Sequence, residues 1–515
     1  MSKKKVLLRG VFINRDTNGE GVLKVGTTLI RVSTVMGILY LVGCGNSSDS
    51  KSKKDELVVF NAKGENASEF EEMCKAFSEE TGIATKAFSV GSGEDSDEVL
   101  RAQMNSDTPP AVYTLQALRA LPEWKESGRV VDLKTIKDDE FKKIIDGIPE
   151  TMRLNDGGSE SYGIPYGIEG IGFIVDAQMI SDLFGAESGE AVLKDLRNCP
   201  WEEFEAFCEA VDQYISTPTA AKVTLNGNEY SFQAEKTGRA ASLTGVFAFA
   251  GAEKWVFADH LLNMPMGAVV KTPAEAQNVD TELIDEAKPA FMAYAEAMEF
   301  YTDHAAGLNG HAGRGADLVN SANFGYDQTV QMYADGNALF LQQGNWAYSN
   351  IAKVDEAVAE RSSFIPLKMP FTDSMMLNGR SAEQLNSSII VTTGNYYAIN
   401  AKVSEKQQEY AVEFLKWMMK PENVEKYIIG KFKFIPYNVT EDMKLDNALS
   451  ASIQSYMGEG NVINDTVVGT PKTWSGEKVG TALLEKYLRQ EEWDDSTIES
   501  IGELCVDSWK ELKTN

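Results

Sequence analysis

Apolar residues recur in short blocks along the body of the chain, and their spacing alternates between that of strands and that of helices. Residues 57–60 are an unbroken apolar run, and residues 69–80 carry apolar side chains three and four positions apart. Residues 83–88 and 98–105 repeat the strand and the helix, and residues 111–115 form a third apolar run. This alternation predicts an α/β fold with mainly parallel sheets.

Three extended stretches interrupt the alternation. Residues 162–176 are broken by glycines and one proline, and shorter extended stretches follow at 395–400 and 434–437. Strands that cross between two lobes have this form. Because ligands of α/β sheets bind at the carboxyl ends of strands, we expect the turn 61–66 and Gln116 to lie near a site.

Further helices and loops are expected in the second half of the body. Residues 201–214, 328–335 and 405–419 have helical spacing, whereas residues 215–240 and 368–390 are polar or irregular. We expect the last two blocks to be loops, either at the rim of a ligand cleft or elsewhere on the surface.

Near its start the chain has the pattern of a secretory signal. Residues 32–43 are mostly apolar and are preceded by basic residues, and small residues stand just before Cys44. These features are typical of a signal peptide, so we expect residues 1–43 to be removed. Because residues 1–30 contain no clean apolar core, a translation start near Val22 is an alternative that gives a signal of ordinary length.

The run Leu-Val-Gly-Cys that ends at Cys44 resembles the lipobox of bacterial lipoproteins. This resemblance implies that the Cys44 thiol is acylated and that the lipid holds the protein on the extracellular face of the cell membrane. Residues 45–55 are polar, so residues 44–55 are expected to be the lipid-anchored cysteine and a flexible tether. The alternative is a cysteine that is buried at the end of an apolar run.

The composition limits the partners. With 515 residues, of which 43% are hydrophobic, the chain can form two or three cores. Its formal net charge of −28 repels nucleic acid, which is therefore not expected as a partner. The five cysteines and three histidines are too few and too widely spaced for a disulfide framework or a metal centre. We expect no metal and no cofactor.

Tryptophans supply candidate ligand contacts. Trp346 follows Gly-Asn at the end of an apolar run, where one indole face can meet a cleft. Sugar rings pack their C–H face on aromatic rings while amides and carboxylates reach their hydroxyls, so Trp346 and Asn345 are candidates for sugar contact. Trp255 is a further candidate, and so is Trp474, which stands in a loop that looks exposed. For each tryptophan the alternative is packing in the core.

Several segments, in order, resemble maltose-binding protein and its relatives, the carbohydrate-binding proteins of ABC importers. The main segment is 338–351, Ala-Leu-Phe-Leu-Gln-Gln-Gly-Asn-Trp-Ala-Tyr-Ser-Asn-Ile. The other segments are residues 77–83, 108–116, 127–128, 131–133, 164–176, 201–204, 397–400, 411–417 and 434–436. Each is weak alone, and the resemblance depends on their order and spacing over nearly the whole body.

This resemblance implies a two-lobed, periplasmic-binding-protein-like fold of type II that closes on an oligosaccharide. It implies that Trp346 stacks on a sugar and that Glu169, in the first crossing, accepts hydrogen bonds from hydroxyls. Asn61 and Lys63 would add polar contacts from the first turn. Gln116 stands where the relatives present a ligand-facing side chain. The acidic residue before the lysine is absent, as are the Trp and Asp of the maltose binders at the end of the third strand, which puts maltose itself in doubt.

The crossings set the expected lobe boundaries. Residues 56–167 with 397–437 would form the N-terminal lobe, and residues 168–396 with 438–515 the C-terminal lobe.

The expected function is capture of an oligosaccharide by a monomeric, lipid-anchored binding protein that delivers it to the transmembrane subunits of an ABC permease, without catalysis. A secreted glycoside hydrolase is the first alternative, and it needs a second carboxylate roughly 5–10 Å from Glu169, for which the sequence shows no candidate. A sugar-sensing binding protein and a purely structural surface lipoprotein are the others.

Overall fold

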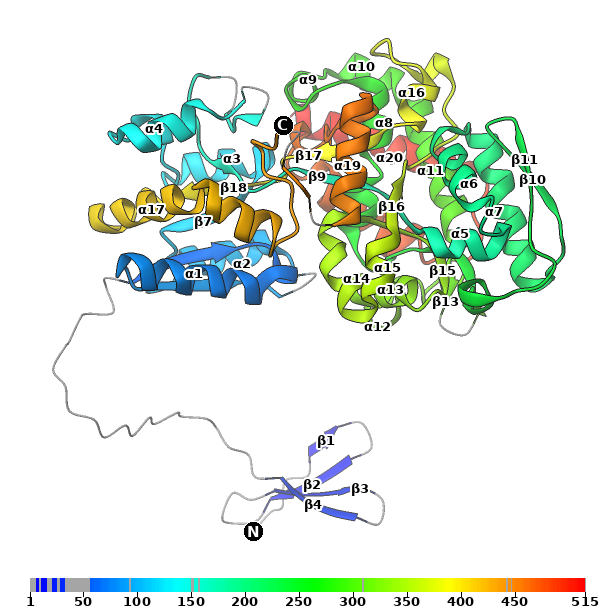
Figure 1. Ribbon diagram of the computed structural model, residues 1–515, viewed down its shortest axis with the longest axis horizontal. Helices are drawn as coiled ribbons and strands as arrows, with labels where there is room; N and C mark the ends of the chain where they lie inside the picture. The colour runs from blue at the N-terminus through cyan, green and yellow to red at the C-terminus, as the bar shows by residue number, and fades with distance from the viewer. Residues whose placement is uncertain are drawn as a thin grey trace. The chain divides into compact units, whose positions relative to one another are not determined.

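The computed structural model divides the chain into two units, Met1–Ser52 and Lys53–Asn515. The residues that it describes are 6–8, 11–15, 21–25 and 28–32 in the first unit, and 56–515 in the second without 92–93, 150–151, 156–157, 308–309, 441–442, 446 and 515. Figure 1 shows the elements of both units with their labels.

The described part of the first unit is a four-stranded antiparallel sheet in the order β1-β2-β3-β4. Its strands are β1 (Val6–Leu8), β2 (Val11–Arg15), β3 (Gly21–Val25) and β4 (Thr28–Val32). All four lie within the predicted signal segment. Cys44 and the predicted tether lie outside the described residues, so the signal peptide and the lipid anchor stay predictions.

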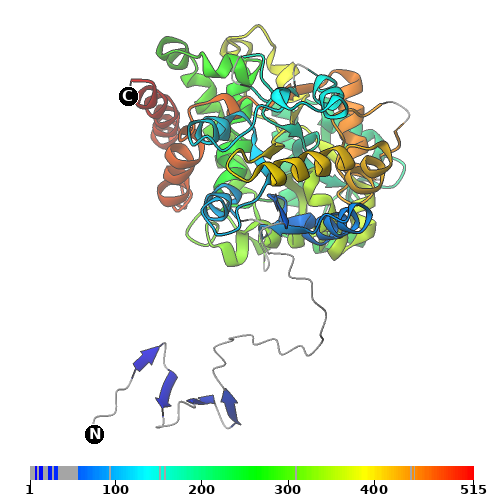
Figure 2. The ribbon, with the colours of Figure 1, turned by 90° about the vertical axis from the view of Figure 1, so that its left-hand side faces the viewer.

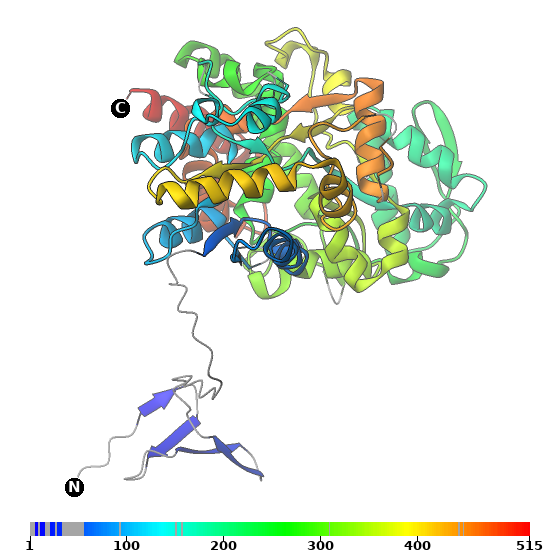
Figure 3. The same ribbon diagram turned by 60° about the vertical axis from the view of Figure 1, so that its left-hand side comes forward.

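The first lobe of the second unit is built on a five-stranded sheet in the order β6-β5-β7-β18-β8. Its strands are β5 (Leu57–Asn61), β6 (Thr85–Ser89), β7 (Val112–Gln116), β8 (Ile164–Pro165) and β18 (Asn395–Ile399). Its helices are η2 (Gly64–Asn66), α1 (Ala67–Thr81), α2 (Ser96–Met104), α3 (Ala117–Glu126), η3 (Leu133–Thr135), α4 (Asp139–Asp146), α17 (Glu405–Met418), α18 (Pro421–Asn423) and η9 (Val424–Ile429). In Figures 2 and 3, α17 runs across this lobe with α1 beside it.

The predicted elements of this lobe form because their apolar side chains share one face. In α1, Phe70, Met73, Cys74 and Phe77 are buried, which is the three-and-four spacing of a helix that packs on a sheet. Gly82 ends α1 with a left-handed φ of 75°, a conformation that glycine adopts without steric cost. β5 is buried at all five positions, as expected for a strand in the interior of a covered sheet.

The second lobe is built on a six-stranded sheet in the order β12-β15-β9-β17-β19, with β16 also paired to β9. Its strands are β9 (Glu169–Asp176), β12 (Gly245–Ala248), β15 (Ala338–Gly344), β16 (Ser362–Ile365), β17 (Ile389–Thr392) and β19 (Val462–Asn464), and two hairpins pair β10 (Lys222–Leu225) with β11 (Asn228–Ser231) and β13 (Ala306–Gly307) with β14 (Gly310–His311). The helices that surround them up to residue 334 are α5 (Ala177–Phe184), α6 (Gly189–Asn198), α7 (Trp201–Ser216), η5 (Gly238–Ser242), η6 (Val256–His260), α8 (Asn263–Val269), α9 (Pro273–Gln277), α10 (Thr281–Glu286), α11 (Lys288–Asp303), α12 (Ser321–Phe324) and α13 (Tyr326–Ala334). The later helices are η7 (Asn345–Ala347), α14 (Tyr348–Val354), α15 (Glu356–Arg361), η8 (Asp373–Met375), α16 (Ala382–Asn386), α19 (Ala448–Glu459), η10 (Val467–Gly469), η11 (Trp474–Gly480), η12 (Leu483–Tyr487) and α20 (Asp495–Thr514).

Extended segments connect the two sheets. The chain passes from β8 to β9 and returns from β17 to β18, each time within a few residues. A third segment runs alongside, since the Ile168 amide donates to the Ile435 carbonyl over 2.6 Å. β18 begins at Asn395, so the change of sheet comes two residues before the predicted boundary at 396/397.

Both sheets are mixed, whereas the sequence pattern predicted mainly parallel sheets. The pairs β5–β6, β5–β7, β12–β15 and β17–β19 are parallel, but β9 and β18 are antiparallel to each of their described neighbours. These two strands enter from the other lobe through a short extended segment. Each therefore runs against the strands of the sheet that it joins.

The two blocks predicted to be loops contain regular structure. Residues 215–240 include the β10–β11 hairpin, and residues 368–390 include α16 and the start of β17. The hairpin turns at Asn226 and Gly227, whose φ angles are 50° and 76°. An Asn-Gly pair is a strong hairpin signal because both residues tolerate positive φ, so this element could have been found from the sequence.

Candidate functional site

An ion pair joins the two lobes of the second unit. Lys63 follows β5 in the first lobe, and Glu169 is the first residue of β9 in the second. The Lys63 Nζ lies 2.5 Å from the Glu169 Oε1, and the two side chains are 12% and 6% exposed. The structure thus brings together two predicted site residues that are far apart in the sequence.

The turn that carries Lys63 is held by Asn61. The Asn61 Nδ2 donates to the Lys63 carbonyl over 2.8 Å and to the Asn66 Oδ1 over 3.0 Å, and its Oδ1 accepts from the Lys63 amide over 3.0 Å. Asn61 is fully buried. The Asn61 side chain therefore shapes the turn, and its contact with a ligand stays a prediction.

Burial and neighbouring charges act in opposite directions on Lys63. Burial by itself would lower the pKa of Lys63, but the carboxylates of Glu169 and Glu65 raise it, and the net shift is upward. Burial raises the pKa of Glu65, and Lys63 offsets only part of this shift. Lys63 is therefore a firmly charged cation at the contact between the lobes.

Trp346 lies directly beside this ion pair. The Lys63 Nζ is 4.9 Å from the centroid of the Trp346 ring, within the range of a cation–π contact. The indole is partly buried and packs against the hydrophobic cores of both lobes. A Cβ at Gly344 would overlap the Trp346 ring, which explains why glycine stands two residues before the tryptophan.

An aromatic wall continues from Trp346 into η6. The His260 ring centroid is 5.4 Å from that of Trp346 and 5.1 Å from that of Trp255. Trp255 is partly exposed, whereas His260 is buried. Burial lowers the pKa of His260 to about 4, so the imidazole is neutral at physiological pH. The predicted residue Trp255 thus lies near Trp346, and sequence reasoning missed His260 between them.

Two buried amide side chains, Gln343 and Asn345, belong to the segment that carries the indole. The Trp346 Nε1 donates to the Gln343 Oε1 over 3.1 Å, and the Gly170 amide donates to the Asn345 Oδ1 over 3.0 Å. Gln343 and Asn345 are 0% and 1% exposed. Asn345 was predicted at the site. Gln343 was not, although the run Gln-Gln-Gly-Asn-Trp contains it.

Gln116 ends β7 and stands beside the start of α3. Its Nε2 donates to the Ser96 Oγ over 2.8 Å, and its side chain is partly exposed. The next residue, Ala117, has a φ of 41°, a strained conformation for a residue other than glycine. Gln116 is therefore held at a strained strand-to-helix corner, and its contact with a ligand stays a prediction.

Trp474 is not in an exposed loop, and that expectation is wrong. Its side chain is fully buried, its ring centroid is 5.0 Å from that of Trp509, and its Nε1 donates to the Cys505 carbonyl over 2.8 Å. The polar residues around Trp474 suggested exposure, but α20 packs over the indole. Trp474 belongs to the core of the second lobe.

A second polar contact joins the lobes at Arg119. The Arg119 Nη1 lies 2.8 Å from the Asp259 Oδ1, which also accepts from the Ser475 Oγ over 2.7 Å. The Arg119 and Asp259 side chains are 22% and 24% exposed. Asp259 adjoins His260 in η6, so the same turn carries part of the aromatic wall and this interlobe contact. Local sequence patterns hold no signal for such a pair, because its members are 140 positions apart.

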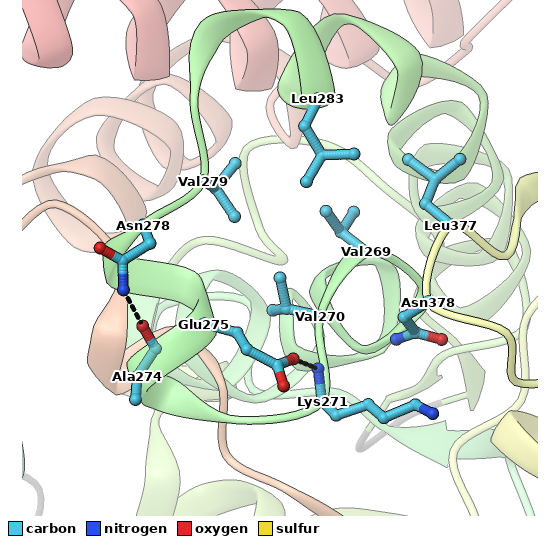
Figure 4. Close-up of a pocket in the computed structure, with 10 residues that line it drawn as sticks. All are labelled: Val269, Val270, Lys271, Ala274, Glu275, Asn278, Val279, Leu283, Leu377 and Asn378. Atoms are coloured by element: carbon cyan, nitrogen blue, oxygen red, sulfur yellow. Dashed lines mark hydrogen bonds between the residues drawn. The ribbon is translucent and has the colours of Figure 1, made fainter.

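Figure 4 shows a separate surface pocket of about 610 Å³ on the second lobe. Valine and leucine side chains face it, and Lys271, Glu275, Asn278 and Asn378 stand at its edge. None of its lining residues belongs to the contact around Lys63 and Trp346. Leu377 and Asn378, from the 368–390 block, are among the residues that line this pocket.

Within the described ranges, no group of three or more His, Cys, Asp and Glu side chains is placed to hold a metal ion. No helix in the part of the chain that the structure describes is both long and apolar enough to span a membrane.

Solved structures resemble this chain over most of its length. One is the SBP RafE in complex with raffinose, with 16% identity and a TM-score of 0.57, covering 89% of this chain and 99% of that one. Another is a chitin oligosaccharide binding protein, with 15% identity and a TM-score of 0.59, covering 88% and 99%. A third is maltose-bound MalE3 of T. maritima, with 14% identity and a TM-score of 0.57, covering 89% and 99%. At these identities the likeness shows the fold alone, and it confirms the predicted two-lobed α/β fold.

The sequence comparisons give the family. No curated protein matches the chain. Residues 72–456, well over half of the chain, match the family described as bacterial extracellular solute-binding protein, which is a family of binding proteins and not of enzymes. The chain is therefore a member of the bacterial extracellular solute-binding protein family.

Proposed function

We propose that this protein captures an oligosaccharide between its two lobes, outside the cell, and delivers it to the transmembrane subunits of an ABC permease. In this proposal the protein is a monomer that is anchored to the membrane by a lipid on Cys44. It binds its ligand without catalysis.

The observation that carries the proposal is the group formed by Lys63, Glu169 and Trp346. It places an aromatic face, a carboxylate and a cation together at the contact between two lobes. A sugar ring needs such a combination, because its C–H face packs on an indole while its hydroxyls bond to charged and amide groups. Separation of the lobes would give a ligand access to this group, and hinge closure is an established motion of two-lobed binding proteins.

The similar structures support the same ligand class. They are a raffinose complex, a chitin oligosaccharide binding protein and a maltose-bound protein. The missing maltose-type residues near Lys63 and Gln116 argue for a sugar other than maltose. Because all three relatives are distant, each of these sugars serves here as a probe.

The test is a thermal-shift and titration-calorimetry screen of the purified protein with raffinose, maltose and chitin oligosaccharides. A ligand at 100 times its Kd stabilises the folded state by about 2.7 kcal/mol, which raises the Tm by a few degrees for a protein of this size. Trp346→Leu should abolish the shift. The matched control is Trp493→Leu, because Trp493 packs on Tyr487 away from the lobe contact and its loss should leave the Kd unchanged.

Two results would contradict the proposal. Binding that persists unchanged in Trp346→Leu would remove the indole from the site. Hydrolysis of the sugars by the purified protein would favour the glycoside hydrolase instead. Delivery to a permease, as opposed to sensing, is tested by sugar uptake in cells that lack the gene.

A further inference from the structure

Three buried side chains around Trp346 each have one polar atom without a hydrogen-bond partner among the described residues. Two of them contact the indole, and the third belongs to the residue before it in the chain. These atoms are the His260 Nδ1, the Gln343 Nε2 and the Asn345 Nδ2. The three residues are 7%, 0% and 1% exposed. Native proteins pair the great majority of their buried polar atoms, so three such atoms beside one indole call for an explanation.

The neighbours of Gln343 and Asn345 show which atom of each amide group is the nitrogen. The Gln343 Oε1 accepts from the Trp346 Nε1, and the Asn345 Oδ1 accepts from the Gly170 amide. An N–H group can only donate, so each amide must turn its oxygen toward that group. The remaining atom of each side chain is therefore an NH₂ group, which needs an acceptor.

His260 is the third of these buried side chains. Its ring lies between the indoles of Trp255 and Trp346, and burial keeps it neutral. A neutral imidazole carries one donor and one acceptor nitrogen, so it can bond to a hydroxyl in either sense. All three side chains come from the second lobe, and Trp346 beside them packs against the cores of both lobes. These side chains therefore lie beside the contact between the lobes.

We propose that Gln343 and His260, together with Asn345, recognise the edge of the sugar ring that stacks on Trp346. The two amide donors select a ring whose edge presents acceptor oxygens beside the indole. This inference rests on the proposed function and extends it, because it names the residues that determine which sugar is accepted.

The test uses two isosteric variants, Gln343→Glu and Asn345→Asp. Each keeps the oxygen that holds Trp346 or the Gly170 amide and replaces the NH₂ donor by a second oxygen. Calorimetry with whichever of raffinose, maltose or chitin oligosaccharide binds the wild-type protein should show at least a roughly tenfold rise in Kd for each variant.

The matched control is Asn386→Asp, in a buried amide whose two polar atoms both bond to the backbone of Met369 over 2.9 Å. This variant should lower the Tm and leave the Kd unchanged. If the new carboxylates at 343 and 345 lower the Tm further than the control does, Gln343→Met and His260→Phe test the same point without a charge. Each of these should also raise the Kd at least roughly tenfold.

The outcomes separate this inference from the function on which it rests. If Trp346→Leu abolishes sugar binding while the variants at 343, 345 and 260 bind as tightly as wild type, the inference is wrong and the proposed function stands. The three side chains would then only support the indole and the backbone. If the wild-type protein binds none of the three sugars, the proposed function fails and this inference fails with it.

Discussion

The ion pair between Lys63 and Glu169 should control the balance between closed and open lobes, and Lys63→Met tests this. Methionine keeps most of the length of the lysine side chain and removes its charge. In the closed form, the variant leaves the Glu169 carboxylate buried beside Trp346 without its cation.

The expected magnitude follows from the burial of the pair. The side chains are 12% and 6% exposed and their charged atoms are 2.5 Å apart. Removal of one member of such a pair costs about 3–5 kcal/mol, because the remaining charge stays desolvated. Opening of the lobes returns Glu169 to water, so this cost falls on the closed form. A loss of about 3 kcal/mol lowers the closed-to-open ratio by a factor of roughly 100.

The assay is a distance measurement between fluorescent labels on the two lobes. Asp107→Cys and Glu286→Cys provide exposed positions in the first and second lobe, and Cys44 is changed to serine. The cysteines in the described part of the body are all buried and should not react. Lys63→Met should lengthen the mean distance without ligand, and small-angle scattering should show a larger radius of gyration.

Two further variants show whether the effect belongs to the pair. Lys63→Met with Glu169→Gln should restore much of the closed population, because no uncompensated charge remains. The control is Lys431→Met, which removes an exposed ion pair with Glu72 inside the first lobe and should not change the distance. If Lys63→Met and the wild type give the same distance distribution, the reasoning about this pair is refuted.

Three other predictions concern the contact at Arg119, the buried imidazole and the buried tryptophan. Asp259→Asn should weaken the closed form by about 1–2 kcal/mol, because its partner Arg119 is only partly screened by water. Release of bound sugar, measured by stopped flow, should therefore become faster. An unchanged release rate would contradict this prediction. His260 has a folded-state pKa of about 4 against an ordinary value of 6.5, so the unfolded state binds more protons between these values and stability falls as pH falls. The free energy of unfolding of wild type relative to His260→Gln, measured by urea titration, should therefore drop by up to roughly 3 kcal/mol from pH 6.5 to pH 4, and a constant difference would exclude this role. Trp474→Ala should lower the free energy of unfolding by about 3–5 kcal/mol without altering the Kd for sugar, and a changed Kd in the folded variant would place Trp474 at the site after all.

The hydrophobic pattern determined much of the fold. Apolar spacing located β5 and α1 to within a few residues, and glycine-broken extended stretches located the segments that join the two sheets. These features are local, because a strand or helix that packs on one face must repeat its apolar residues at a fixed period. The hairpin at Asn226 was equally local, and only its turn signal was overlooked.

The candidate site depended on more than local pattern. The resemblance to maltose-binding protein singled out Lys63, Glu169 and Trp346, and the structure places these three together. Gln343 and His260, which the structure places against Trp346, were not among the candidates, because no local pattern marks a single glutamine or histidine as a ligand contact.

Only the tertiary structure decided how individual side chains are used. The Asn61 side chain bonds to its own turn, and the Trp474 side chain is buried beneath α20. Arg119 meets Asp259 across the lobe contact, and β9 and β18 run antiparallel to their neighbours. The partners of Asn61 at 63 and 66 are local, but no apolar period reveals them. The other cases depend on which distant segment covers a residue, and no local period encodes that choice. The sequence by itself therefore determined the elements and the family, whereas the packing of the two lobes brought Lys63, Glu169 and Trp346 together.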